Sequence, residues 1–308
     1  IASCLVGSEM CIRDRYKNSL KKMNTSKFKK LKELSTKART YSLTSIFFAG
    51  SGHPGGVLSS IDIILYIYLY KIKITKISDF KKNNRNRFIL SKGHSVPAIY
   101  GTLAALKVLN FKRIFNLRKV DSVYQGHPCR INTSWIEAST GSLGQGFSFA
   151  IGQALTLKYF KNKNKIFVMI GDGEMQEGQI WEGLLFAAHH KLKNLITILD
   201  YNKLQSDNFN KNIINIEPLK QRLKSFNWNV IEINGHSFSQ IEKALGKQFK
   251  NSKPTFIIAN TIKGKSISFM ENAPKWHGSV KMTFDQISSA LKQLGAKQSM
   301  IEKCKKHE

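Results

Sequence analysis

The chain has 308 residues, of which 42% are hydrophobic, so it is long enough and apolar enough to form a sizeable core. Its formal net charge is +29, but the lysines are spread along the chain and do not alternate with aromatic residues, which argues against a nucleic-acid-binding protein. No run of 18 apolar residues is free of charge and the four cysteines form no CxxC pair, so we expect a cytoplasmic protein without a membrane span, a disulfide framework or a zinc site.

The beginning of the chain differs from the rest. It starts with Ile1 rather than Met, and residues 1–15 show neither helical nor strand periodicity. Met23 is a candidate start, and a basic helix is expected from about Ser26. We therefore predict that residues 1–22 are a non-native or disordered leader, and that residues 23–308 form a single domain.

The first half of the chain is predicted to be mostly helical. Apolar residues recur at helical spacing in four segments, and a short strand lies between the second and the third. The predicted helices cover residues 35–49, 59–70, 96–108 and 144–159, and the strand covers residues 87–90. Glycine-rich turns separate these elements, as at Gly50-Ser51-Gly52, and mark where helices end.

Strands and helices alternate in the second half. Buried strands are predicted over residues 165–170, 195–199, 229–233 and 255–260, and helices over residues 177–190, 218–226 and 239–249. This alternation is typical of βαβ units, so we predict an α/β fold with a doubly wound, mostly parallel sheet and helices on both faces. A basic tail that starts as a helix is expected from about Ser279.

Polar side chains follow two neighbouring strands of this sheet. Asp172 lies in Gly171-Asp172-Gly173 after one strand, and Asn202 follows the next, 30 residues later. One βαβ crossover has about this length, so both side chains should reach the same edge of the sheet. Carboxylate and amide oxygens suit Mg²⁺ or Ca²⁺, and the glycines let the backbone approach a phosphate. The pattern predicts a site for a divalent metal and a diphosphate.

Five further segments accompany this pair, the last of them in two parts, and together the six resemble the transketolase family of thiamin-diphosphate enzymes. They are Ser51-Gly52-His53-Pro54-Gly55-Gly56, Leu90-Ser91-Lys92-Gly93-His94, Gly126-His127-Pro128, Thr140-Gly141-Ser142-Leu143-Gly144-Gln145-Gly146, Thr261-Ile262-Lys263-Gly264-Lys265 and Pro274-Lys275-Trp276-His277-Gly278. The last segment, Thr261 to Lys265 leading to Pro274 to Gly278, resembles the form found in split transketolases, whose N-terminal half is a separate subunit. The resemblance covers about residues 29–280.

The resemblance implies a role for individual residues at a cofactor site. Asp172 and Asn202 would bind the metal through their side chains, and Leu204 through its carbonyl group. The residues implied in binding thiamin diphosphate are His94, Gly141, Ser142, Leu143, Gly173, Glu174, Asn202 and His277. His53, His127, His277 and Glu177 are the implied catalytic residues, and Glu177 and Glu182 would lie at an interface that links two active sites.

The function that this resemblance implies is the transfer of a two-carbon ketol unit from a ketose phosphate to an aldose phosphate, a step of carbohydrate metabolism and the pentose phosphate pathway. Neutral imidazoles suit this chemistry because they exchange protons with sugar hydroxyls near neutral pH. The family's second thiamin domain does not follow in this sequence, so we expect a C-terminal partner subunit and an α2β2 heterotetramer. The cofactors would be thiamin diphosphate and Mg²⁺, or Ca²⁺.

Two other interpretations remain open from the sequence. The metal motif is shared with other thiamin-diphosphate enzymes, such as 2-oxo acid dehydrogenases and deoxyxylulose-phosphate synthase. The second interpretation is a non-catalytic regulatory subunit that kept the fold, although the presence of Asp172, Asn202 and Glu177 argues against it. We expect no nucleic acid and no membrane among the partners.

Overall fold

The computed structural model describes the backbone of residues 2–206 and 208–307 and the side chains of residues 25–206 and 208–307. A five-stranded sheet lies at its centre, with every neighbouring pair parallel and the strand order β1-β2-β3-β5-β4. The strands are β1 (Arg87–Leu90), β2 (Ile166–Gly171), β3 (Leu195–Tyr201), β4 (Asn229–Asn234) and β5 (Thr255–Asn260). The predicted parallel α/β sheet is therefore confirmed.

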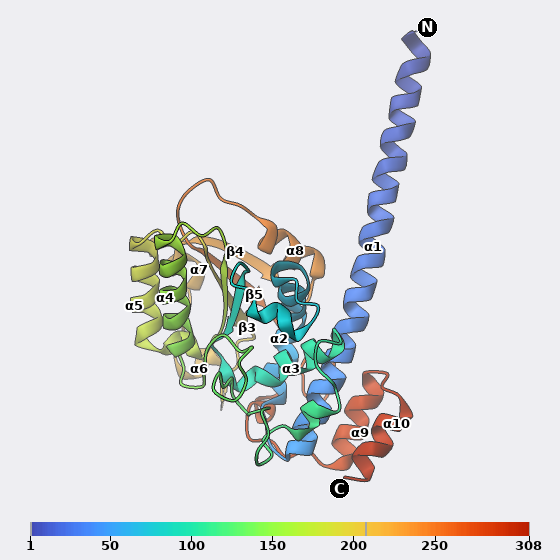
Figure 1. The fold of residues 1–308 in the computed structure, drawn as a ribbon, viewed down its shortest axis with the longest axis vertical. Helices are drawn as coiled ribbons and strands as arrows, with labels where there is room; N and C mark the ends of the chain where they lie inside the picture. Colours follow the sequence, from blue (N-terminus) through green and yellow to red (C-terminus); the bar gives the residue numbers. More distant parts are fainter. Residues whose placement is uncertain (1, 207, 308) are drawn as a thin grey trace.

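Helices cover both faces of the sheet (Figure 1). They are α1 (Ala2–Ala49), α2 (Pro54–Tyr66), α3 (Val96–Ala105), α4 (Gln145–Tyr159), α5 (Gly178–His189), α6 (Asn210–Ile213), α7 (Leu219–Ser225), α8 (Phe238–Gly246), α9 (Phe284–Gln293) and α10 (Gln298–Lys305). The backbone of α1 begins at Ala2, while side chains before residue 25 lie outside the described residues. The interpretation of residues 1–22 as a leader stays a prediction.

Alternate residues of the central strands enter two separate cores. Phe167 and Met169 of β2 join the core formed with α1, α2, α3 and α8, while Val168 and Ile170 join the core formed with α4, α5 and α7. Successive side chains of a strand point to opposite faces, so a run buried on both faces is apolar throughout. The sequence of β2 therefore reflects its place inside a three-layer structure.

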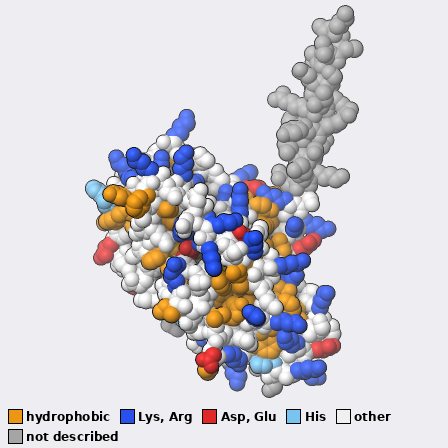
Figure 2. All heavy atoms as spheres, in the orientation of Figure 1, with side chains coloured by type: hydrophobic (Ala, Val, Ile, Leu, Met, Phe, Trp, Pro, Cys, Tyr) orange, Lys and Arg blue, Asp and Glu red, His pale blue; other side chains and the backbone are white. Residues whose placement is uncertain are grey.

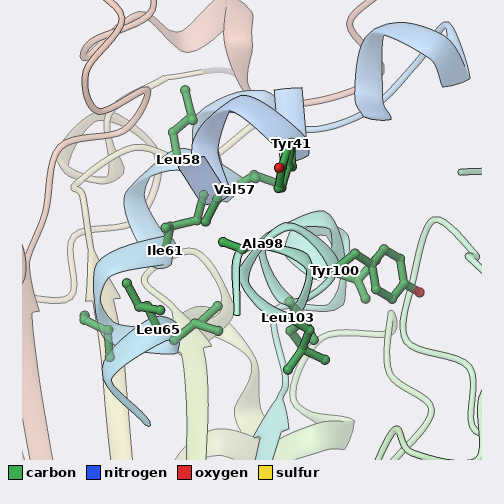
Figure 3. Packing of buried hydrophobic residues seen from close by; sticks show 14 of the residues in the cluster. Tyr41, Val57, Leu58, Ile61, Leu65, Ala98, Tyr100 and Leu103 are labelled. Carbon is green, nitrogen blue, oxygen red and sulfur yellow. The ribbon is translucent and has the colours of Figure 1, made fainter. Parts of the chain in front are cut away.

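The most apolar helical segment of the chain lies in the first core. Residues Pro54–Ile72 are long and apolar enough to cross a membrane, but 83% of the window is buried inside the protein. Figure 3 shows Val57 and Ile61 of α2 facing the side of α3 that carries Ala98, with Leu65 of α2 and Leu103 of α3 in the same cluster. This burial accounts for the hydropathy of the segment without a membrane.

The carboxyl ends of the strands carry the loops that contain most of the predicted site residues. The strands are parallel, so residues after β1, β2, β3 and β5 all emerge at one edge of the sheet. The loops there contain Lys92 and His94, Asp172, Asn202, and Lys263. On the outside, Figure 2 shows many Lys and Arg side chains and few acidic ones, as the net charge of +29 requires.

Candidate functional site

Asp172 and Asn202 follow two strands that pair directly. Gly171 at the end of β2 is in register with Asp200 near the end of β3. The Asp172 carboxylate accepts hydrogen bonds from the backbone N–H groups of Gly173, at 2.9 Å, and of Lys203. Because Lys203 adjoins Asn202, the two predicted ligands lie at the same point of the sheet edge, and both are buried.

The third predicted metal ligand, the carbonyl group of Leu204, lies beside them. The N–H group of Leu204 donates to the Asn202 side-chain oxygen at 3.1 Å, which fixes the turn after β3. Its carbonyl oxygen accepts a hydrogen bond from Nζ of Lys263 at 3.1 Å. The residues predicted to bind a metal thus lie in two neighbouring strand-end loops, which the hydrogen bond from the N–H group of Lys203 to Asp172 joins.

The structure brings together the four histidines singled out from the sequence. The ring of His53 lies 5.1 Å from that of His94, 6.4 Å from that of His127 and 5.7 Å from that of His277, measured between centroids. The rings of His94 and His277 are 5.4 Å apart. Four separate loops supply these imidazoles, so their convergence is a property of the fold rather than of any single motif.

The environment keeps these imidazoles neutral. Burial, followed by the charge of Arg118, lowers the pKa of His53 to about 4, and burial with the charge of Lys263 lowers the pKa of His277 to about 3. Burial likewise lowers the pKa of His94 well below its usual value, and that of His127 to a smaller extent. At neutral pH each ring therefore has one N–H donor and one acceptor nitrogen.

Two buried lysines and one buried aspartate complete the site, and sequence reasoning gave none of them a role. Lys263 contacts Nδ1 of His277 as well as the carbonyl group of Leu204. Lys92 forms an ion pair with Asp200, and both side chains are almost fully buried. Both lysines lie within segments that were singled out in the sequence, each directly before a glycine in a strand-end loop. This position is the feature by which the sequence could have indicated their place in the site.

Asp200 is fully engaged by its surroundings. Its carboxylate accepts hydrogen bonds from the hydroxyl groups of Ser59, at 2.6 Å, Ser60, at 3.0 Å, and Thr261, in addition to the ion pair with Lys92. Burial opposes its ionisation, but Lys92 and the hydroxyl donors together lower the pKa of Asp200 below its usual value. For Asp172, burial and then the charge of Asp200 raise the pKa. The site thus contains two buried carboxylates whose pKa values are shifted in opposite directions.

The loop with Gly141, Ser142 and Leu143 borders the histidines. A Cβ atom on Gly141 would lie 3.3 Å from Cδ2 of His127, so the absence of a side chain allows the close approach of the ring. The carbonyl group of Leu143 accepts a hydrogen bond from Gln179 at 2.9 Å, while Ser142 is exposed. The backbone of this loop therefore lines one side of the site.

Glu174 ties the loop to two strand ends. Its carboxylate accepts hydrogen bonds from Ser91, from the N–H group of Gly144 at 2.8 Å and from that of Gly171 at 3.1 Å. These protein donors engage both of its oxygens, and burial raises its pKa. Its predicted contact with a cofactor stays a prediction, and its visible role is to position the loops around the site.

Glu177 and Glu182 lie apart from the histidines. Both side chains are exposed at the beginning and on the outer face of α5. Within the residues whose side chains are described, neither carboxylate forms a hydrogen bond or an ion pair with an imidazole of the cluster. Their predicted place at an interface between subunits needs exposed side chains, and the catalytic role of Glu177 stays a prediction.

The donors at the sheet edge are chemically suited to a divalent cation with a diphosphate. Asp172, Asn202 and Leu204 offer oxygens that keep free lone pairs, and hard cations prefer such ligands. A Cβ atom on Gly56 would lie 3.1 Å from Oγ of Ser95 and 3.5 Å from Nζ of Lys92, so this glycine leaves a space beside a cation. Among the residues whose side chains the structure describes, none is a hydrogen-bond partner of the buried Oγ of Ser95 or Nδ1 of His53, which leaves both atoms for a ligand.

Comparison with known proteins matches the chain, rather than individual site residues, with a known family. Residues 31–304 match the family model described as transketolase, thiamine diphosphate binding domain. The chain is 38% identical over 258 residues to the 6-deoxy-6-sulfo-D-fructose transketolase subunit of Clostridium sp., covering 83% of this chain and 93% of that one. It is 36% identical over 261 residues to human transketolase, covering 84% of this chain but 41% of the relative.

The fold gives the same match. The crystal structure of transketolase from Campylobacter jejuni superposes with a TM-score of 0.79 at 31% sequence identity, over 90% of this chain and 45% of that one. The chain thus spans less than half of the full-length transketolases and nearly all of the Clostridium subunit.

Proposed function

The chain belongs to the family of transketolase thiamine-diphosphate-binding domains, and on this premise we propose that it is the cofactor-binding subunit of a two-subunit transketolase. The complex would transfer a two-carbon ketol unit from a ketose phosphate to an aldose phosphate. The single observation that supports this most strongly is the convergence of four neutral imidazoles beside the Asp172–Asn202 pair.

The metal and the diphosphate would be held by oppositely charged groups. Asp172, Asn202 and the carbonyl group of Leu204 would bind Mg²⁺, or Ca²⁺, through oxygen. Lys92 and Lys263 are cations buried at the same sheet edge, where a low dielectric strengthens their attraction for phosphate. Gly173 and His94 would contact the diphosphate, the first through its backbone and the second through an imidazole N–H.

The histidines would then act on the sugar. When bound, thiamine diphosphate supplies the nucleophilic carbon that takes up the two-carbon unit. His53, His127 and His277 would donate hydrogen bonds to sugar oxygens and accept protons from sugar hydroxyls. Their lowered pKa values keep an acceptor nitrogen available at neutral pH.

A partner subunit is part of this proposal. The Clostridium relative is named a subunit, and this chain covers 93% of it. We propose that a second chain supplies the remaining thiamin domain, in an α2β2 cytoplasmic assembly. The named donor of that relative, 6-deoxy-6-sulfo-D-fructose, differs from an ordinary sugar phosphate, so the sugars should be identified by assay with a panel of ketoses.

The decisive experiment removes one metal ligand. In the assembled complex, Asp172→Asn should weaken thiamine diphosphate binding by about 100-fold at a fixed Mg²⁺ concentration, because the carboxylate charge is lost. Binding is measured by isothermal titration calorimetry, and circular dichroism checks the fold. The control is Asp285→Asn, an exposed aspartate in the first turn of α9, which should bind normally. Equal affinities of the two variants would refute the proposed site.

A second assay separates transketolase from related enzymes. The complex should show ketol transfer between sugars and no decarboxylation of 2-oxo acids. The reverse result would favour a 2-oxo acid dehydrogenase, and binding of the cofactor with neither activity would favour a regulatory subunit.

A further inference from the structure

A cavity opens at the opposite edge of the sheet from the histidines. It has a volume of about 620 Å³, and the residues around it include Lys165, Asn194 and Lys253, which directly precede or nearly precede β2, β3 and β5. The strands are parallel, so their amino ends lie a full strand length from the carboxyl ends that carry Asp172 and Asn202. The cavity is therefore separate from the proposed cofactor site.

The walls of this cavity are exceptionally basic. Eight of its eighteen lining residues are lysines and none of the described residues that line it is Asp or Glu, whereas the whole chain has 49 Lys and Arg among 308 residues. None of the eight lysines forms an ion pair with a carboxylate in the described part of the chain. Their charges are thus not neutralised within the protein.

Helix ends explain only part of this charge. Lysines stand at the ends of α4, α5 and α8, where the carbonyl groups attract cations, and Lys158 donates a hydrogen bond to the carbonyl group of His190 at 2.6 Å. Each helix end carries a partial charge of only about −0.5, and there are three of them against eight ammonium groups. Most of the positive charge of the lysines is therefore not balanced by the helix ends, and the cavity favours binding of an anion that carries several negative charges.

The cavity also has an apolar surface. Ile196 and Leu245 are buried beside it, and Phe249 is half-buried, with Nζ of Lys247 at 4.9 Å from the centre of its ring. The exposed amide of Gln248 lies next to the ring in sequence and suits the polar edge of a base. Small-molecule sites have volumes of about 300–1,000 Å³, so the cavity is of the right size for one such ligand.

From the lysines, the aromatic ring and the volume together, we propose that this cavity binds a nucleoside polyphosphate. The phosphates lie among the lysine ammonium groups, and the base packs against Phe249 and Leu245. This site does not require that the chain has the function proposed above, because it shares no residue with the histidine cluster.

The test measures binding of ATP to the full chain by isothermal titration calorimetry, with thiamine diphosphate and Mg²⁺ in excess. The salt concentration is about 0.1 M, at which electrostatic interactions between exposed charges extend over about 10 Å. We expect saturable binding of one ATP per chain. Lys193→Gln with Lys253→Gln should weaken it by about tenfold or more, because two exposed cations are lost. The matched control, Lys292→Gln with Lys305→Gln, removes two exposed lysines of α9 and α10 and should change it less than about twofold.

A further comparison tests the role of the ring. Phe249→Leu should weaken binding of ATP and leave binding of inorganic tripolyphosphate unchanged. The proposal is overturned if ATP shows no saturable binding, if the control pair weakens it as much as the cavity pair, or if tripolyphosphate binds as tightly as ATP. Binding of ATP only when thiamine diphosphate is left out would also overturn the proposal, because both ligands would then share the other site.

Discussion

The ammonium group of Lys263 lies 3.1 Å from the carbonyl oxygen of Leu204, the oxygen that we propose as a metal ligand. The same group contacts Nδ1 of His277 and donates to the carbonyl oxygen of Gln205 at 3.2 Å. One buried side chain therefore connects the turn after β3 with a histidine of the cluster. Burial lowers the pKa of Lys263 to about 8, while the carboxylates of Asp172 and Asp200 act in the opposite direction and favour the charged form.

Lys263→Met should weaken binding of thiamine diphosphate by at least about tenfold, because the diphosphate loses a buried cation. Methionine keeps most of the volume of the lysine stem, so the packing should persist. The affinity is measured in the assembled complex by titration calorimetry. The control is Lys265→Met, a partly exposed lysine paired with Glu271, which should bind the cofactor normally. Loss of affinity in both variants would mean that a general charge effect is responsible.

The ion pair of Lys92 and Asp200 should dominate the stability of the site. Asp200→Asn leaves the ammonium group of Lys92 buried without a counter-charge, which costs about 3–5 kcal/mol of unfolding free energy. The measurement is urea unfolding followed by circular dichroism.

The chain contains a matched exposed pair for comparison. Lys220 and Glu232 lie 3.6 Å apart and both side chains are nearly half exposed. Glu232→Gln should therefore cost less than about 1 kcal/mol, since water screens both charges. If both substitutions cost the same, burial is not what gives the Lys92–Asp200 pair its effect.

The histidine cluster predicts sensitivity to mild acid. An unfolded histidine takes up a proton near pH 6.5, whereas in the folded protein burial lowers the pKa of His53 to about 4 and that of His277 to about 3. Between these values the unfolded state binds more protons than the folded state. The histidines therefore contribute fully to the free energy of unfolding above about pH 6.5, and this contribution is lost as the pH drops towards 4. Thermal unfolding midpoints at pH 7.5, 6.5 and 5.5 would measure this.

A double variant tests whether the cluster is the cause. His53→Gln with His277→Gln removes two of these groups and should flatten the dependence of the unfolding midpoint on pH. His189→Gln, an exposed histidine at the end of α5, should leave it unchanged. An unaltered slope in the double variant would assign the acid sensitivity to other groups.

Most of the sheet could be predicted from the sequence because its strands are buried on both faces. Val168 and Ile170 lie in one core and Phe167 and Met169 in the other, so β2 reads as an uninterrupted apolar run. Helix starts were less accurate. The helix expected from residue 59 begins at Pro54, since proline is suited to a first helical turn and no capping side chain marks the position.

The site was only partly predictable. His53, His94, His127 and His277 stand beside glycine or proline in loops, and that context singled them out. Lys263 was not predicted to be a site residue, because in a chain of net charge +29 a lysine is expected to have a solvated side chain. Its burial arises from contacts with Leu204 and Gln205, about sixty residues earlier, and such distant contacts are not visible in a local pattern.

The exposed apolar side chains of α5 predict where subunits meet. Leu185 is 58% exposed and Phe186 is 43% exposed, three and four residues after Glu182, so all three share one face of the helix. We expect Leu185→Lys to raise the dissociation constant of the assembly by about tenfold or more, because an apolar contact is replaced by a buried charge. Analytical ultracentrifugation of the complex measures this. The control is Tyr159→Lys, 80% exposed at the end of α4, which should assemble normally. Intact assembly of the Leu185 variant would place the interface elsewhere. It would also argue against the predicted place of Glu177 and Glu182 at that interface.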